Sequence, residues 1–135
     1  MKAELKFIGE IATPYQVVEE CPNNINFEGP KCQITVFDDY QEGLAGLKVG
    51  QHILVMYWLD GAQRDLTKQS CRNGTSITGT FSLRSPRRPN PIGVAVLPIE
   101  EIGEGTIAVR GLDCLNGTKL IDIKPAIYRE GGAGR

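Results

Sequence analysis

The stretch TFSLRSPRRPNPIG, residues 80–93, organises the rest of the chain. Its three prolines fix their own φ angles and push the residues before them toward extended backbone. The stretch can therefore form neither a helix nor a regular central strand. Working outward from it, we predict that residues 77–83 form a strand that enters the stretch and residues 92–99 a strand that leaves it. A stiff loop between two strands is expected.

Cationic and hydrogen-bonding side chains fill this loop, among them Arg84, Arg87, Arg88, Ser85 and Asn90. A stiff loop of this kind can hold an anionic or zwitterionic ligand with a small ordering cost. Arginine suits the task because its planar fork matches carboxylate and phosphate oxygens two at a time. The alternative is a proline-stiffened surface connection whose arginines are simply solvated. Both interpretations are compatible with the spacing of these residues.

The length and composition are those of one globular domain. A chain of 135 residues is long enough for one ordinary core and too short for two. Apolar residues make up 41% and charged residues 23%, which is typical of a folded protein that is neither disordered nor embedded in a membrane. We predict a domain over residues 1–128 and a flexible tail over residues 129–135.

Several classes of function are disfavoured. The net charge of −1 argues against a uniformly basic protein that coats nucleic acid. The four cysteines are widely spaced and His52 is the single histidine, so we expect free thiols and no metal site. The longest apolar run, residues 53–59, is too short to span a bilayer, and charges interrupt the first residues where a signal peptide would have its apolar core. A cytoplasmic location is expected.

The remaining apolar segments indicate strands. We predict them at residues 4–12, 32–37, 52–59, 106–112 and 119–123. Residues 52–59 are apolar without alternation, which predicts a strand buried on both faces. About seven short strands and no long helix predict an all-β domain. No strand precedes a GxGxxG motif and a helix, so a Rossmann-type cofactor site is not supported.

The polar segment at residues 61–74 allows two interpretations. Arg64, Lys68 and Arg72 recur at intervals of four, so a helix would carry them as one basic stripe. The glycine and asparagine near its ends and the low apolar content favour a mobile loop instead.

Residues 80–93 resemble the TRSPxRPNPIG signature of the TsaA-like family, also called TrmO. Three further segments resemble the same family in the same order: IGEIATPY at residues 8–15, GLKVGQHILVMYWL at residues 46–59 and LDCLNGTKLIDIKP at residues 112–125. The resemblance covers nearly the whole chain. It implies an S-adenosylmethionine-dependent tRNA adenine-N6-methyltransferase, built as a single small β-barrel domain with long loops. It also implies a homodimer whose sites lie near the interface.

The resemblance implies a set of residues that contact the cofactor. Arg84 would bind a carboxylate or hydroxyl of S-adenosylmethionine, and the Val94 side chain would face its adenine. The full set implied by the family is Arg84, Leu59, Asp60, Gly61, Val94, Arg110, Gly111, Leu112 and Asp113.

The implied acceptor is N6 of threonylcarbamoyl-adenosine beside the tRNA anticodon. That nitrogen belongs to a urea-like group with a delocalised lone pair, so a base that removes its proton would help. Asp113, Asp122 and Tyr57 are candidate catalytic residues, and the sequence does not rank them. A basic loop beside a pocket can grip phosphates and receive one splayed base. The candidates for this RNA-binding role are Arg87, Arg88, Arg64, Lys68, Arg72 and Lys124.

Two departures from the family pattern bear on these roles. NGTK at residues 116–119 replaces the common DGTP, and Asp60 stands where a histidine is often found. Longer members carry a further C-terminal domain, whose surface a homodimer is expected to replace. The alternatives are an S-adenosylmethionine-binding or RNA-binding module that transfers no methyl group, and a methyltransferase with another acceptor.

Overall fold

The computed structural model describes residues 1–71, 74 and 76–127, and these residues are mostly strand and loop. Nine strands occur among them: β1 (Gly9–Ala12), β2 (Lys31–Val36), β3 (His52–Trp58), β4 (Lys68–Ser70), β5 (Ile77–Gly79), β6 (Ile92–Pro98), β7 (Glu101–Ile102), β8 (Thr106–Arg110) and β9 (Thr118–Pro125). The helical segments in this part of the chain are three short 3-10 helices: η1 (Val18–Glu20), η2 (Asp38–Leu44) and η3 (Thr80–Ser82). None of the described helices is long and apolar enough to cross a membrane. The prediction of an all-β domain is therefore confirmed.

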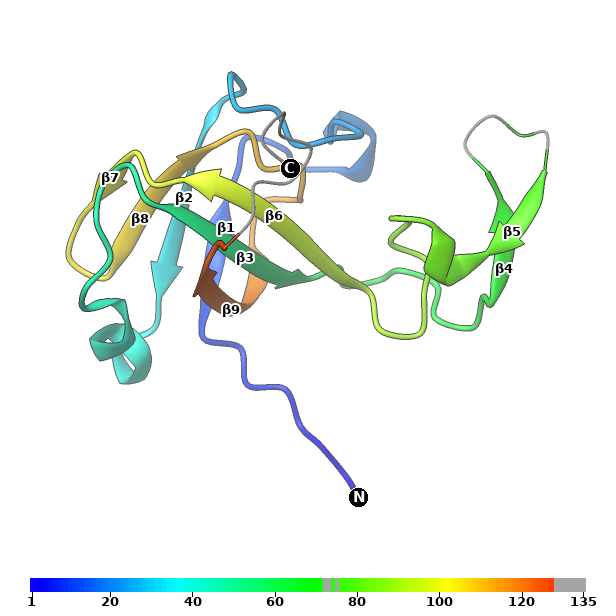
Figure 1. Ribbon diagram of the computed structural model, residues 1–135, viewed down its shortest axis with the longest axis horizontal. Helices are drawn as coiled ribbons and strands as arrows, with labels where there is room; N and C mark the ends of the chain where they lie inside the picture. The colour runs from blue at the N-terminus through cyan, green and yellow to red at the C-terminus, as the bar shows by residue number, and fades with distance from the viewer. Residues whose placement is uncertain (72–73, 75, 128–135) are drawn as a thin grey trace.

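Seven of these strands form one antiparallel sheet in the order β6-β3-β9-β1-β2-β8-β7. Within it, β3 pairs with β6 on one side and with β9 on the other. The order of the strands in the sheet therefore differs from their order in the sequence. Strand β9, near the C-terminus, lies between β3 and β1 (Figure 1).

The expected barrel is wrong in one respect, because the sheet does not close. The two edge strands, β6 and β7, are consecutive in the chain and are separated by Ile99 and Glu100 alone. The amide of Ile99 donates to Gln51 O beside β3, whereas the amide of Glu100 donates to Ala108 O on β8. The chain thus crosses from one edge of the curled sheet to the other within two residues. Within the described ranges no ladder joins β6 to β7 or β8, so a seam stays open.

Alternation along the strands determines which face encloses the core. On β3, Ile53, Val55 and Tyr57 are 0–2% exposed, while the residues between them are only partly buried. The prediction that this strand is buried on both faces is therefore wrong. The core cluster gathers the inward-facing side chains of six strands, including Ile11, Ile34, Leu97, Val109 and Leu120. The outward-facing residues of β3 and β6 are also largely apolar, which explains why the sequence shows no alternation there.

The described residues between positions 59 and 91 form an arm that projects away from the seven-stranded sheet (Figure 1). Its tip is the antiparallel β4–β5 hairpin, in which Gln69 pairs with Thr78. Neither the mobile loop nor the helix expected at residues 61–74 forms as such, because β4 occupies part of this segment. The strand expected at residues 77–83 ends at Gly79 and continues as η3. Arg72 and the tail at residues 129–135 lie outside the described residues.

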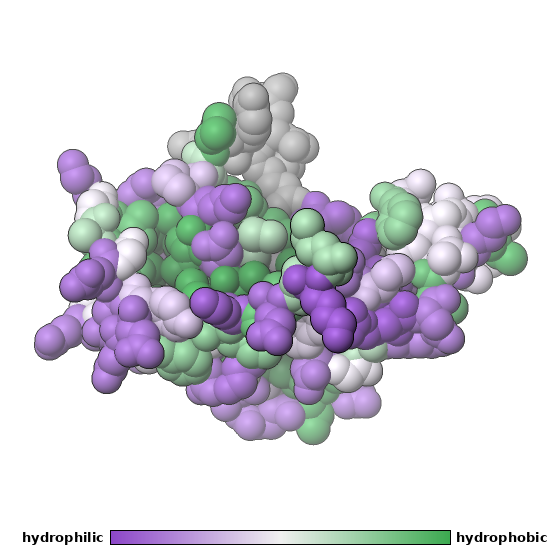
Figure 2. Space-filling view, turned by 90° about the horizontal axis from the view of Figure 1, so that it is seen from below, coloured by the Kyte–Doolittle hydropathy of each residue, from purple (hydrophilic) through white to green (hydrophobic). Residues whose placement is uncertain are grey.

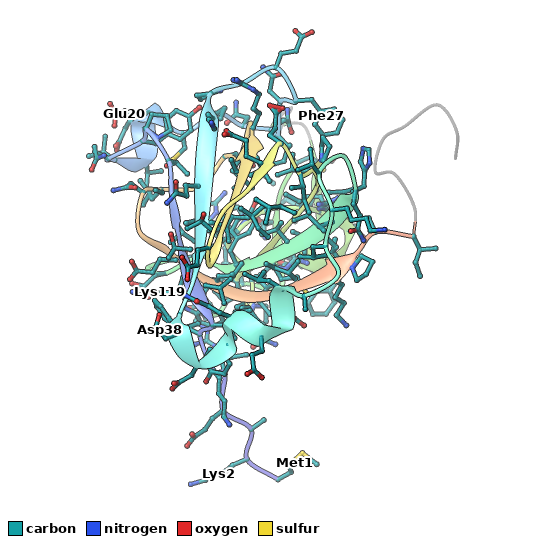
Figure 3. The ribbon with its side chains drawn as sticks, turned by 90° about the vertical axis from the view of Figure 1, so that its left-hand side faces the viewer. Met1, Lys2, Glu20, Phe27, Asp38 and Lys119 are labelled. Atoms are coloured by element: carbon teal, nitrogen blue, oxygen red, sulfur yellow. The ribbon has the colours of Figure 1, made fainter. Side chains whose placement is uncertain are left out.

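The N-terminal segment leaves the main body on the side opposite to η1. Met1 and Lys2 lie far from the sheet, whereas Glu20 and Phe27 lie at the other end (Figure 3). The strand expected from residue 4 begins only at Gly9, where pairing with β2 and β9 starts. The loop between β1 and β2 therefore sits at the end of the sheet that carries the residues after β8.

Candidate functional site

A partly buried hydrogen bond joins two residues that are 56 positions apart in the chain. The Tyr57 hydroxyl, at the end of β3, donates to Asp113 Oδ1 at 2.9 Å. Tyr57 is 2% exposed, and Asp113 is partly buried just after β8. The pair places one carboxylate and one phenol at the edge of the core, where the local dielectric constant is low and polar interactions are strengthened.

Gly93, in the last part of the proline-arginine stretch, makes room for this tyrosine. Gly93 pairs with Tyr57 in the β3–β6 ladder. A Cβ atom at position 93 would lie 2.3 Å from Cε2 of the Tyr57 ring. Real Cβ atoms do not approach that closely, so a side chain here would displace the ring. The glycine that ends the stretch therefore has a steric role in the site.

Asp113 is placed by a close contact between two loops. Gly111 has a φ of 84°, which favours glycine, and a Cβ there would lie 1.6 Å from Asn26 O. The Asn26 amide donates to Gly111 O at 3.1 Å, and the Gly111 amide donates to Pro30 O at 3.0 Å. The β1–β2 loop thus fixes the backbone from which Asp113 reaches Tyr57.

Burial dominates the electrostatics of the pair. It raises the pKa of the Asp113 carboxyl above its ordinary value, while the hydrogen bond from Tyr57 and the charge of Arg84 act in the opposite direction. Burial and, next, the charge of Asp113 raise the pKa of the Tyr57 hydroxyl far above its ordinary range. Tyr57 is consequently a hydrogen-bond donor at neutral pH and cannot accept a proton there.

Arg84 brings the proline-arginine loop to this pair. Its guanidinium donates to Val94 O on β6 at 3.4 Å, and its positive charge partly opposes the rise in pKa that burial causes at Tyr57 and Asp113. Val94 follows Gly93, against which the Tyr57 ring packs, so this contact brings a cation toward the carboxylate and the phenol from a third part of the sequence. This is the set of groups that a zwitterionic ligand requires, since each charge of such a ligand finds its opposite. Within the described ranges no cluster of side chains could hold a metal ion.

The sequence profile of the tRNA-methyltransferase O N-terminal domain family matches residues 10–130. The chain belongs to the TrmO family.

Individual relatives agree with this assignment. The chain is 39% identical over 123 residues to a probable S-adenosyl-L-methionine-binding protein, VirR, from Rhizobium radiobacter, covering 91% of this chain and 70% of that one. It is 39% identical over 120 residues to an S-adenosyl-L-methionine-binding protein from Archaeoglobus fulgidus, covering 89% of this chain and 86% of the relative. A rat tRNA (adenine(37)-N6)-methyltransferase is 35% identical over 100 residues, which are 72% of this chain and 23% of that protein.

Solved structures share the fold. A crystal structure of TrmO matches with a TM-score of 0.79 and 25% identity, covering all of this chain and 62% of that one. The chain therefore spans less than two thirds of the length of that structure.

Among the cofactor contacts implied by the TrmO resemblance, Arg84 and Asp113 come together, and others lie elsewhere. The Arg110 guanidinium contacts a Glu100 carboxylate oxygen and Gly29 O on the surface. Leu112 is 0% exposed within the core, and Gly111 packs against Asn26. The segment formed by Leu59, Asp60 and Gly61 is the turn at the base of the arm, where the Leu59 amide donates to Pro91 O at 2.8 Å.

Val94 and Asp122 lie on the outer face of the sheet. Both pair with Met56, so their side chains project away from the face that carries Tyr57. The backbone oxygen of Val94, rather than its side chain, is what Arg84 contacts. Asp122 Oδ1 accepts from the Ile123 amide at 2.8 Å. The structure thus separates Asp122 from the Tyr57–Asp113 pair.

Two of the arginines predicted to bind RNA hold the arm together instead of extending freely into solvent. The Arg64 guanidinium lies 5.1 Å from the Trp58 ring centroid, and its Nε donates to Pro89 O at 2.7 Å. Arg88 Nη1 donates to Leu83 O and to Ser85 O, both at 2.9 Å. The bonds of Arg88 connect residues within the loop, and the contacts of Arg64 connect the loop to Trp58 at the base of the arm.

The other basic residues predicted to bind RNA and described by the structure are exposed. Arg87 lies at the outside of the proline-arginine loop, Lys68 on β4 and Lys124 on β9. Arg87 and Lys68 belong to the arm, whereas Lys124 belongs to the main sheet.

The departures from the family pattern at residues 116–119 fall on structural positions. Asn116 Oδ1 accepts from the Thr13 amide at 3.1 Å, which joins the β8–β9 loop to the end of β1. Lys119 forms an ion pair with Glu10 and lies opposite Trp58, on the outer face. The NGTK variation therefore leaves the Tyr57–Asp113 pair intact.

Sequence reasoning missed the steric role of Gly93 and the buried amide of Gln69, which donates to Thr80 Oγ1 and to Arg87 O. The sequence carries a signal for the first, since Gly93 follows an apolar strand residue within the signature. It carries none for the second, because Gln69 stands in a polar segment with ordinary loop composition.

Proposed function

We propose that this chain is an S-adenosyl-L-methionine-dependent methyltransferase that acts on N6 of threonylcarbamoyl-adenosine beside a tRNA anticodon. The observation that carries the proposal is the convergence of Arg84, Tyr57 and Asp113 in a chain of the TrmO family. The names of its relatives supply the donor and the class of acceptor. With tRNA as substrate, we also propose a cytoplasmic location.

The residues present suit the methyl donor. Arg84 would pair with the carboxylate of its amino acid head, and Asp113 would accept a hydrogen bond from the amine or from a ribose hydroxyl. Tyr57 would hold Asp113 in one rotamer through the 2.9 Å hydrogen bond. By the TrmO resemblance, the turn at Leu59, Asp60 and Gly61 and the segment from Arg110 to Leu112 would add further contacts to the donor. When bound, S-adenosyl-L-methionine supplies an activated methyl group, so the protein has mainly to position the two reactants and exclude water.

Among the three candidate catalytic residues, Asp113 is the one we propose as proton acceptor. Tyr57 keeps its proton at neutral pH, because the ordinary pKa of a tyrosine is 10.0 and burial raises it further. Asp122 projects from the other face of the sheet. Burial raises the pKa of Asp113, and a carboxylate of increased basicity is a better acceptor for a urea-like N–H.

The arm supplies the proposed RNA contacts. Arg87 and Lys68 are exposed on it and would contact phosphates of the anticodon loop, while Lys124 would extend this contact on the main body. Arg64 and Arg88 would act indirectly, by holding the loop in shape.

A homodimer completes the proposal. Phe81 and Ile77, both on the arm, are 80% and 73% exposed. Apolar side chains reach the surface of both the main body and the arm (Figure 2). On the main body, Leu54, Met56 and Val94 lie on the partly exposed outer face of β3 and β6. An arm with exposed aromatic surface and a sheet with an uncovered apolar face are features of subunits that pair.

A binding module that transfers no methyl group is the second candidate. The relatives from Rhizobium radiobacter and Archaeoglobus fulgidus are both named for S-adenosyl-L-methionine binding and not for transfer. This function would use the same convergence of Arg84 and Asp113 but would require no acceptor.

The deciding experiment measures methyl transfer from labelled S-adenosyl-L-methionine to tRNA from cells that make threonylcarbamoyl-adenosine and from cells that do not. We expect transfer to the modified tRNA alone. Binding of the donor without transfer to either tRNA would favour the binding module, and transfer to both would indicate another acceptor.

Calorimetric titration of Arg84→Ala tests the site itself. Loss of a charge-assisted pair should weaken donor binding by about tenfold to a hundredfold. The matched control is Lys31→Ala, which removes a surface cation paired with Glu101 and should leave donor affinity unchanged. Equal affinities in the wild type and the Arg84 variant would remove Arg84 from the site.

A further inference from the structure

Gln69 is a buried polar residue on the arm, and it has no direct role in the proposed methyl transfer. It lies on β4 and is 8% exposed. Its Nε2 donates to Thr80 Oγ1 and to Arg87 O, both at 2.9 Å. An amide nitrogen carries two hydrogens, so both are used by residues that belong to the proline-arginine stretch.

Thr80 completes the network at the entrance of the loop. It is 1% exposed, accepts from Gln69 and donates its own hydroxyl hydrogen to Leu66 O at 3.2 Å. Its amide donates to Thr67 O at 2.9 Å, and its carbonyl accepts from the Leu83 amide at 3.1 Å. Gln69 and Thr80 are therefore held together where the hairpin meets the loop, and removal of either partner would leave a buried polar group unpaired.

The hydrogen bond from Gln69 to the Arg87 carbonyl connects this network to the loop. Inside the loop, Arg88 donates to Leu83 O and Ser85 O, and the Arg87 amide donates to Ser85 Oγ at 3.2 Å. These bonds tie residues 83–88 into one stiff unit, which contains Arg84. A group that fixes the Arg87 carbonyl consequently fixes the backbone from which the Arg84 side chain reaches Val94 O, next to Gly93 and the Tyr57 ring.

We propose that Gln69 is a positioning residue, which sets the Arg84 guanidinium against the Tyr57–Asp113 pair by holding the Arg87 carbonyl through a buried amide. The inference rests on the proposed function in one respect, that Arg84 binds the methyl donor. Gln69 acts on Arg84 only through the loop backbone. Preorganisation of this kind lowers the ordering cost when a ligand binds, so its loss should appear as weaker donor affinity.

Two substitutions that nearly preserve side-chain volume test the hydrogen-bond network without leaving a cavity. Gln69→Met removes the amide, and Thr80→Val removes the hydroxyl, whereas Thr80→Ser keeps the hydroxyl as a rescue. Gln63→Met is the matched control, because Gln63 lies on the same arm and its amide donates only to the exposed Asp65 carboxylate among its described contacts. Hydrogen exchange of the Leu83 and Arg87 amides in the ligand-free chain reports on the loop, and calorimetry reports on donor affinity.

We expect both amides to exchange at least about tenfold faster in Gln69→Met and Thr80→Val. Tenfold corresponds to one lost buried hydrogen bond, and each variant loses two bonds of the network. Donor affinity should fall by about the same factor. Thr80→Ser and Gln63→Met should stay within about twofold of the wild type. In an Arg84→Ala background, Gln69→Met should cause no further loss of donor affinity, because its effect passes through Arg84.

Unchanged exchange in Gln69→Met overturns the inference, and so does a loss of donor affinity that persists in full without Arg84. The latter result would show that Gln69 supports the fold as a whole and not the position of one guanidinium. A wild-type chain that binds no donor would instead defeat the proposed function and the role of Arg84 in it. Hydrogen exchange would in that case still decide whether Gln69 holds the loop.

Discussion

Gly93 connects the sequence signature to the site through a steric contact, because the Tyr57 ring occupies the space that a side chain would fill. Gly93→Ala should force the ring or the strand to shift. Overpacking of this kind destabilises by about 1–3 kcal/mol, which urea unfolding can measure. Gly43→Ala is the control, since no atom lies within 4 Å of the position that its added methyl group would take, and its stability should change by less than about 0.5 kcal/mol. Equal stabilities of the two variants would contradict the contact.

The Tyr57 hydroxyl has a measurable effect on its partner. Its hydrogen bond favours the ionised form of Asp113 and opposes the effect of burial. Tyr57→Phe should therefore raise the pKa of Asp113 above its wild-type value, which carbon NMR of the side-chain carboxyl can follow. Tyr40→Phe, at an exposed position, should leave the pKa of Asp113 unchanged. A lower Asp113 pKa in the Tyr57→Phe variant would mean that the hydrogen bond is not formed in solution.

The arm is the element that sequence patterns described least well. Its prolines indicate a connection without regular secondary structure, as found at residues 83–91, and the expected strand that leaves the loop is β6. Strand β4, however, is three residues long and carries the polar residues Lys68, Gln69 and Ser70, so neither alternation nor composition marks it. This segment is a strand because it pairs with β5 and because the Gln69 amide is buried, and both are tertiary contacts.

The arm also carries the exposed aromatic surface proposed for dimerisation. Phe81→Ser should weaken the dimer by at least about tenfold, because loss of a buried aromatic anchor typically costs more than about 1.4 kcal/mol. Sedimentation equilibrium of the purified chain over a range of concentrations would measure the change. Phe27→Ser, which alters a 55% exposed aromatic residue on the main body, should leave the association constant unchanged. A wild-type chain that is monomeric at all concentrations would defeat the proposed dimer.

For the molecule as a whole, the strand content followed from apolar segments bounded by turns, whereas sheet closure did not. Closure depends on whether β6 reaches β8, and the two residues between β6 and β7 instead carry the chain across the seam. In the same way, residues 52–59 lack alternation because both faces of β3 are apolar, and only one of them faces the core. The convergence of Arg84 and Asp113 was implied by family resemblance, whereas the Tyr57 bond between β3 and the residues after β8 required the fold.

Buried thiols and phenols make the stability of the whole domain sensitive to alkaline pH. Burial raises the pKa of Cys114 from 9.0 to about 12, and it also raises the pKa values of Cys32 and Tyr57. Between about pH 9 and 12 the folded chain then holds protons that the unfolded chain has lost. The free energy of unfolding must therefore fall as pH rises through this window, by up to about 1.4 kcal/mol per pH unit for each such group.

Urea unfolding at intervals from about pH 7.5 to about pH 10.5 tests this linkage. The wild-type chain should be stable to the same extent below about pH 8 and should lose stability progressively above about pH 9, where free thiols ionise. Cys114→Ala should show a shallower decline, because one titrating group is gone. Val109→Ala truncates a side chain in the same core without removing a titrating group, so it should lower stability equally at every pH. Parallel curves for the wild type and the Cys114 variant would show that this thiol is not buried in the folded chain as the core packing requires.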